Sequence, residues 1–146
     1  MTKFVRIGEH VRQTMGVIRY LSLEWLDALS ADVAASAELQ QLATVHRIGI
    51  TQVITDAPDG TVIYHLQVGD GVAQFGWGGA FPEDVRMEQS WDTAVAVATG
   101  TLNAQEAFIK GRIKLSGNQQ LLSESGAVFG ALDATFAKLR ERTDYR

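Results

Sequence analysis

Few side chains in this 146-residue sequence have the types and spacing that acid–base or nucleophilic chemistry requires. The three histidines, His10, His46 and His65, stand far apart, and none has a metal-binding spacing such as HExxH. The sequence has no cysteine, which excludes thiol catalysis, disulfides and thiolate metal sites. No serine stands in a nucleophile-elbow pattern. The residue types therefore give no sign of a catalytic residue or of a bound metal, and we expect no cofactor.

Two groups of residues keep an enzymatic alternative open. His65 lies in the middle of a predicted strand, and Glu83, Asp84 and Glu88 cluster just before and within another strand. Histidines on strands are more often structural or surface residues, and carboxylates in loops are usually solvated. A small enzyme acting on a hydrophobic substrate would need one of these groups inside a cavity, with a shifted pKa.

Composition and charge describe an ordinary globular domain. Hydrophobic residues make up 46% of the sequence and charged residues 21%, and the formal net charge is −4. A negative net charge disfavours a nucleic-acid partner, which would attract a basic surface. No apolar run approaches the length of about 20 residues that spans a bilayer, and no apolar signal-peptide core follows the N-terminus. We expect a cytoplasmic protein without stable membrane insertion.

Periodicity predicts a helix followed by strands in the first two thirds of the sequence. Residues 22–44 have helical spacing, with Ser22 as the N-cap and a break near 34–36. From His46 the apolar period becomes two, and four strands follow, within 47–55, 61–68, 72–78 and 85–91. Hairpin signals at Asp59-Gly60 and at 69–71 indicate an antiparallel meander.

The last third predicts two short helices, a fifth strand and a long helix. Asp92 is the expected N-cap of the first helix, and Asn103 with Glu106 forms a capping box for the second. The fifth strand lies within 112–117 and must join the sheet through a helical crossover, which allows parallel pairing. Asn118 then caps a long helix, in which two glycines could mark a bend. The predicted fold class is α+β, with a five-stranded, mainly antiparallel sheet covered by helices.

Most aromatic residues fall in the second half of the sequence. They either fill a solid core or line a cavity between sheet and helices, and periodicity cannot distinguish these alternatives because both require inward apolar side chains. The residues concerned are Phe75, Trp77, Phe81, Trp91, Phe108, Phe129 and Phe136.

The stretch "TGTLNAQEAFIKGRIKLSGN", residues 99–118, resembles the signature of the sterol carrier protein-2 family. The positions that match the family pattern are Gly100, Asn103, Gln105, Ala107, Phe108, Gly111, Lys114, Gly117 and Asn118. The sequence departs from the pattern at Ala104, where the family often has proline, and at Arg112, where it often has lysine. The resemblance assigns residues 22–142 to a lipid-binding domain like those of the family and leaves 1–21 as an N-terminal arm without an assigned role.

The resemblance implies a non-enzymatic protein that binds or transfers a fatty acid, an acyl-CoA or a sterol-like lipid in an apolar tunnel. Its partner would be a small hydrophobic ligand, and a homodimer is compatible with the pattern. An alternative is an accessory or oligomerisation domain with a closed cavity that supports an enzyme. The predicted ligand-binding residues are Phe75, Trp77, Trp91, Leu102, Gln105, Phe108, Ile113, Leu122 and Phe129.

Overall fold

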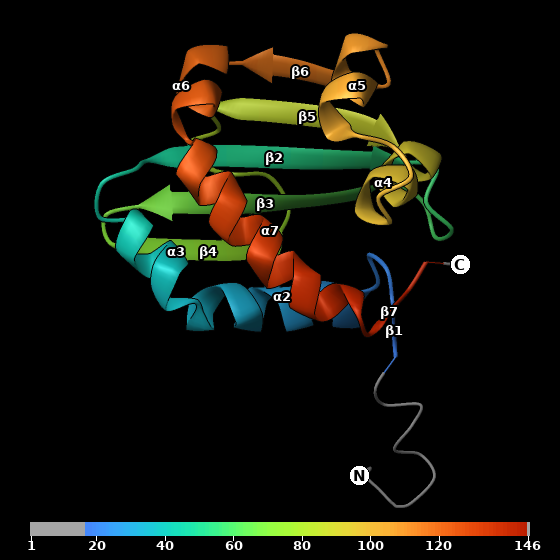
Figure 1. Cartoon of the computed structure of the whole chain (residues 1–146), viewed down its shortest axis with the longest axis horizontal. Helices are drawn as coiled ribbons and strands as arrows, with labels where there is room; N and C mark the ends of the chain where they lie inside the picture. Colours follow the sequence, from blue (N-terminus) through green and yellow to red (C-terminus); the bar gives the residue numbers. More distant parts are fainter. Residues whose placement is uncertain (1–16, 146) are drawn as a thin grey trace, which may run out of the picture.

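The computed structural model describes residues 17–145 and has the predicted α+β architecture (Figure 1). The strands are β1 (Ile18–Arg19), β2 (Ile48–Thr55), β3 (Val62–Gly69), β4 (Val72–Trp77), β5 (Val85–Ser90), β6 (Ile113–Gly117) and β7 (Thr143–Asp144). The helices are α2 (Leu23–Ala35), α3 (Ala37–Leu42), α4 (Trp91–Ala98), α5 (Ala104–Ile109), α6 (Gln119–Glu124) and α7 (Gly126–Arg140). Among the helices within 17–145, none is long and apolar enough to cross a membrane.

The main sheet has five strands in the order β4-β3-β2-β5-β6. Strands β2, β3 and β4 form the predicted antiparallel hairpins, but β5 pairs with β2 in parallel, so the prediction of a four-stranded meander was wrong. The helical crossover that leads to the fifth strand allows parallel pairing, but β6 pairs with β5 antiparallel. The sheet is therefore mixed and mainly antiparallel, as the fold class requires.

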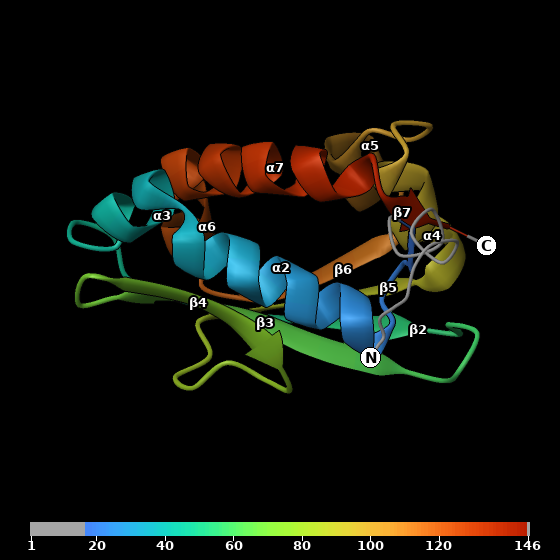
Figure 2. The same ribbon diagram turned by 90° about the horizontal axis from the view of Figure 1, so that it is seen from below.

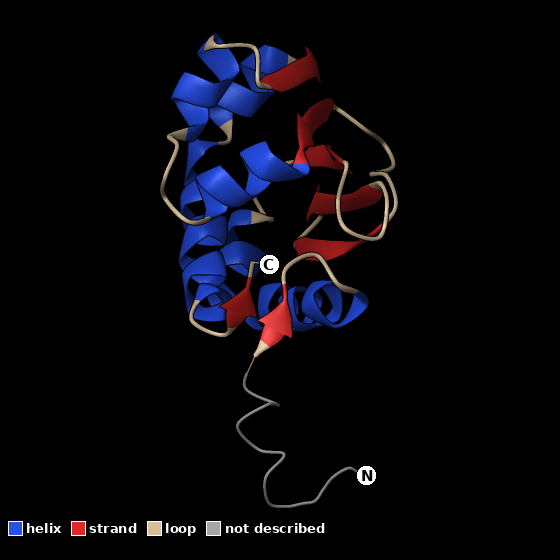
Figure 3. Cartoon of the chain, turned by 90° about the vertical axis from the view of Figure 1, so that its right-hand side faces the viewer, coloured by secondary structure: helices blue, strands red, loops and turns tan. Residues whose placement is uncertain are grey.

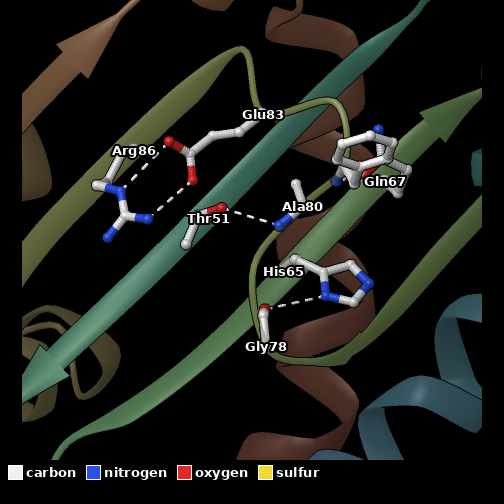
Figure 4. Close-up of polar contacts among 8 residues, drawn as sticks. Thr51, His65, Gln67, Gly78, Ala80, Glu83 and Arg86 are labelled. Carbon is white, nitrogen blue, oxygen red and sulfur yellow. Dashed lines mark hydrogen bonds and ion pairs between the residues drawn. The ribbon is translucent and has the colours of Figure 1, made fainter.

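The chain between β4 and β5 explains the changed strand order. Residues 78–84 cross the face of the sheet that carries no helices and deliver β5 to the far side of β2 (Figures 1 and 4). Backbone and side chain both hold this crossover: Asp84 N–H donates to the Gly49 carbonyl at 2.8 Å, and Gly49 N–H donates to Asp84 Oδ2 at 2.7 Å. The buried Thr51 hydroxyl accepts from Ala80 N–H at 2.9 Å.

Local capping follows the sequence closely, with one correction. Ser22 and Ser36 cap α2 and α3, which confirms the predicted break between these helices. Asn118 caps α6 as predicted. The predicted cap at Asp92 was wrong: Ser90, the last residue of β5, accepts from Thr93 N–H at 3.2 Å and begins α4 two residues earlier. The cap is formed where the strand ends, so strand and helix join without a loop.

The predicted capping box and the predicted C-terminal helix both agree in outline with the structure. Asn103 Oδ1 accepts from Glu106 N–H at 3.2 Å, and Glu106 forms an ion pair with Lys110 at 3.2 Å. The long C-terminal helix is divided at Ser125 into α6 and α7. The bend predicted near the glycines thus falls immediately before the first of them, Gly126.

The helices cover a single face of the sheet in unequal layers (Figures 2 and 3). Helix α2 packs directly on β4, whereas α7 packs on α2 and α3 and lies farther from the sheet. Helix α4 lies against β5 and β2 at one end of the sheet. The apolar inner face of the sheet and the buried stripe of α2 form the core; its fully buried side chains include Leu26, Leu29, Ile48, Ile50 and Ile54.

The segment just before α2 belongs to this core. Strand β1 pairs in parallel with β7, through Ile18 N–H to the Arg142 carbonyl at 2.7 Å and Tyr20 N–H to the Asp144 carbonyl at 2.8 Å. The side chains of Ile18, Tyr20 and Leu21 are buried. Residues 17–21, for which the sequence predicted no role, therefore tie the two ends of the domain together. Residues 1–16 lie outside the described part of the chain.

Replacing Gly49 tests the crossover. A Cβ at Gly49 would lie 2.0 Å from the Pro82 carbonyl oxygen, so the crossover backbone would have to shift. We expect Gly49→Ala to lower the free energy of unfolding by about 1–3 kcal/mol, the usual effect of overpacking. Gly130→Ala is the matched control, because a Cβ there meets no atom within 4 Å; it should raise stability by up to about 1 kcal/mol in helix α7. Equal effects in urea titrations of the two variants would contradict this account.

Candidate functional site

A cavity of about 330 Å³ lies between the sheet and α7. This volume falls in the range of pockets that bind small molecules. Its lining comes from the sheet, from α2, α4 and α7, and from the segments at both ends of the domain. The lining residues are Tyr20, Trp25, Gln52, Tyr64, Met87, Gln89, Ala94, Val97, Ala98, Phe129, Leu132, Asp133, Phe136, Arg140, Thr143 and Tyr145.

The floor of the cavity is formed by neighbouring strands. Tyr64 of β3, Gln52 of β2 and Met87 of β5 occupy directly paired positions, so their side chains form one row on the inner face. Gln89 follows two residues after Met87 and therefore points to the same face. The strand alternation that buries Ile50 and Ile54 thus also presents this row to the cavity.

Small residues on one side and large apolar residues above give the cavity its shape. Ala94, Val97 and Ala98 of α4 form the side wall with short side chains. Phe129 and Phe136 of α7, with Leu132 between them, form the roof. The apolar side chains of α7 thus cover this space.

Trp25 holds the roof at its distance from the sheet. Its ring is buried and stacks on Phe136 of α7, with ring centroids 6.0 Å apart and an angle of 21° between the planes. Its indole Nε1 donates to Thr143 Oγ1 at 3.1 Å, which links α2 to β7. A large rigid ring between α2 and α7 therefore prevents α7 from settling onto the strands.

One end of the cavity is closed by an aromatic cluster from distant parts of the sequence. Tyr20 contacts Trp25, Trp91 and Tyr145, with ring centroids 5.0, 5.3 and 4.9 Å apart. The cluster joins the segment before α2, the start of α4 and the C-terminal segment. Aromatic pairs at these separations contribute stability beyond their burial alone.

The cavity reaches the surface along α7. Asp133 and Arg140 both line it, and their side chains are 77% and 43% exposed. They form an ion pair of 3.7 Å with each other. The entrance therefore carries one positive and one negative charge, whereas the interior is apolar apart from uncharged polar groups.

Burial governs the acid–base behaviour of the interior. Burial raises the pKa of Tyr64 far above its ordinary value, and burial raises the pKa of Tyr20 in the same direction, with smaller effects from Tyr64 and Tyr145. Both phenols are therefore neutral at physiological pH and can donate hydrogen bonds.

Of the predicted ligand-binding residues, Phe129 lines this cavity. Phe75 is buried in the core beside Tyr64, with ring centroids 5.1 Å apart. Trp91 and Leu122 are partly buried and pack against the core outside the cavity. Trp91 still influences the cavity indirectly, because it supports Tyr20 in the aromatic cluster.

The other predicted residues lie away from the cavity. Trp77 at the end of β4 and Phe108 on α5 are 45% and 44% exposed. Leu102 and Ile113 are half-buried near α5 and β6 and do not line the cavity. The side chain of Gln105 is outside the described part of the structure. Roles for these residues in binding stay predictions.

The sequence contained a signal for part of the lining that was missed. Strand alternation places Tyr64 and Met87 on the inner face, where a lining residue has the same pattern as a core residue. Gln52 interrupts the row of isoleucines in β2, and such an interruption of an inward pattern is the signal for a polar wall. Nothing local could indicate that Tyr20 or Tyr145 would join them, because their contacts are made across the whole chain.

The candidate catalytic groups lie on the opposite face of the sheet (Figure 4). His65 Nδ1 lies 3.0 Å from the Gly78 carbonyl of the crossover. Glu83 contacts Arg86 at 3.2 Å, and a hydrogen bond from Thr51, followed by the bonds from Arg86, lowers the pKa of the Glu83 carboxyl. Since none of these side chains lines the cavity, the enzymatic alternative loses its best candidates.

These features define a class of protein: an α+β domain in which a mixed sheet and its covering helices enclose an apolar hollow. The model of the SCP-2 sterol transfer family matches residues 24–130. The chain therefore belongs to this family, which confirms the resemblance found in residues 99–118.

Solved structures confirm the fold. A crystal structure of sterol carrier protein 2 aligns with a TM-score of 0.58 and 18% identity, over 85% of this chain and 99% of that chain. Apo sterol carrier protein 2 from Yarrowia lipolytica aligns with a TM-score of 0.55 and 17% identity, over 80% and 88% of the two chains.

A curated relative is much longer than this chain. Peroxisomal multifunctional enzyme A from Dictyostelium discoideum is 41% identical over 63 residues, which are 43% of this chain and 14% of that protein. The similarity concerns a small part of the enzyme.

The buried tyrosines predict a loss of stability in alkali. Below the ordinary tyrosine pKa of 10.0, both states hold the protons; above it, the unfolded chain releases protons that buried Tyr20 and Tyr64 retain, so stability falls as the pH rises. Tyr64→Phe should reduce this fall by up to about 1.4 kcal/mol per pH unit. Urea titrations at several alkaline pH values measure it. An unchanged pH dependence in Tyr64→Phe would contradict the assignment.

Proposed function

We propose that this protein binds and carries a hydrophobic ligand, such as a fatty acid, an acyl-CoA or a sterol-like lipid, in the cavity beneath α7, without catalysing a reaction. The observation that carries the proposal is the apolar hollow itself, with a roof of Phe129, Leu132 and Phe136 and a charged entrance. Membership of the SCP-2 sterol transfer family supports the same ligand class. A charged head group would stay near Arg140, where water solvates it.

The apolar lining sets how affinity should depend on chain length. Each buried methylene contributes about 0.8 kcal/mol, which corresponds to about a fourfold gain in affinity per carbon. We expect this gain along the saturated fatty acids from caprylic to lauric acid, until the chain fills the cavity. Displacement of NBD-labelled stearate, followed by fluorescence, measures the series. Affinity that does not depend on chain length, or no saturable binding, would contradict the proposal.

A bulky substitution in the side wall tests the location of the site. Ala98 of α4 lines the cavity, so a tryptophan side chain there would occupy the space of the ligand. Ala98→Trp should weaken fatty-acid binding by at least about tenfold, equivalent to about 1.4 kcal/mol. Ala137→Trp is the matched control, because Ala137 is exposed on α7 and lines no part of the cavity. Circular dichroism checks that both variants fold. Full affinity in folded Ala98→Trp would place the ligand elsewhere.

A second candidate function is that of an accessory domain that supports an enzyme. The observation that favours it is the match to a small segment of a multifunctional enzyme. The two functions differ in what the cavity does: an accessory domain would show no saturable lipid binding, and it would form a dimer or a complex detectable by light scattering.

A further inference from the structure

Two glutamines interrupt the apolar inner face at the floor of the cavity. Gln52 of β2 and Gln89 of β5 both line the cavity, although the neighbouring inward residues of β2, Ile50 and Ile54, are buried core. A polar side chain on an enclosed apolar face is costly unless its hydrogen bonds are made. Each buried polar atom of these two carboxamides therefore needs a hydrogen-bond partner.

The neighbouring methionine fixes how the two carboxamides are oriented. Gln52 Nε2 donates to Met87 Sδ at 3.3 Å, and a thioether sulfur can only accept. Gln52 Oε1 therefore faces Gln89 and accepts from its Nε2 at 3.4 Å. This arrangement leaves Gln89 Oε1 buried, and no described residue donates to it.

Two phenol side chains line the same cavity. Tyr64 is paired directly with Gln52 across β2 and β3, and Tyr20 also lines the cavity. Neither hydroxyl forms a hydrogen bond with another described residue, and burial, which raises the pKa of both phenols, keeps them as neutral donors. We call Gln52, Gln89, Tyr20 and Tyr64 the polar pole of the cavity.

The polar pole is uncharged, whereas the charges of the cavity are at its entrance. Among residues 17–145, Asp133 and Arg140 are the charged residues that line it, and they lie at the exposed rim, paired with each other. A carboxylate at the pole would find no cation among these described residues and would lose its hydration. A hydroxyl group suits the pole, because it can donate to the free carboxamide oxygen and accept from a phenol.

We propose, on the basis of the function proposed above, that the cavity selects amphiphiles whose buried end carries an uncharged hydroxyl group. This hydroxyl donates to Gln89 Oε1 and accepts from the Tyr64 hydroxyl. The polar pole thus determines which end of the ligand enters and which lipids bind best.

The experiment compares lauric acid with ω-hydroxylauric acid as competitors of NBD-labelled stearate. The two differ only by a hydroxyl at the end remote from the carboxylate. In a purely apolar cavity this hydroxyl loses its hydration and weakens binding. At the polar pole it should strengthen binding by about tenfold, as expected for buried hydrogen bonds. Whether ω-hydroxylauric acid binds more tightly or more weakly than lauric acid therefore tests the inference.

Three variants assign the effect to the pole. Gln89→Leu removes the free acceptor at similar volume and should reverse the preference, so that lauric acid binds better. Tyr64→Phe removes only the hydroxyl and should reduce the preference, which keeps the test decisive if Gln89→Leu does not fold. Gln74→Leu is the matched control, since Gln74 is exposed on β4, and it should retain the wild-type preference.

The outcomes separate this inference from the proposed function. If neither acid displaces the probe, the proposed function fails. If lauric acid binds and the ω-hydroxyl weakens binding to the wild type, the protein carries lipids but the polar pole does not select them. A hydroxyl preference that survives in both Gln89→Leu and Tyr64→Phe would also overturn the inference.

Discussion

The separation between α7 and the sheet is the constraint on which the rest of the structure depends. Helix α2 packs on β4, and α7 packs on α2 and α3, so α7 is held away from the strands as the outer layer (Figure 2). Trp25 sets this separation through its stack on Phe136 and its hydrogen bond to Thr143. Close packing is the rule in protein interiors, so a hollow of this size needs such a spacer.

The same spacing explains why the inner face of the sheet is not uniform. Beneath α2 the face carries Leu66, Val68 and Phe75, which are buried in the core. Beyond α2 it carries Gln52 and Gln89, which a tightly packed apolar core would not tolerate without further hydrogen-bond partners. The position of the polar residues thus follows the position of the hollow, and both follow from the place of α2 at one side of the sheet.

Sequence reasoning succeeded where the determining interactions are local. Caps at Ser22, Ser36 and Asn118 depend on bonds to the third residue ahead, and strand alternation depends on a period of two. The strand order was missed because β5 is placed by contacts between Gly49 and Asp84, which lie 35 positions apart. Most of the cavity lining was not predicted. An inward-facing Tyr64 or Met87 fits the same alternating strand pattern whether its side chain packs against another side chain or faces open space.

The stretch at residues 99–118 contains no candidate catalytic residue, and its position in the fold explains what it contributes instead. Its helix and strand lie at the edge of the sheet remote from α2, where Phe108 is exposed. Its strand β6 pairs with β5 from Val85↔Gly117 to Gln89↔Ile113, so it completes the hydrogen bonding of the strand that carries Met87 and Gln89. Gly117 approaches so closely that a Cβ there would lie 2.2 Å from the Asp84 carbonyl oxygen. The stretch therefore contributes by fixing β5, and through β5 the floor of the cavity, since an unpaired edge would leave that strand free to move.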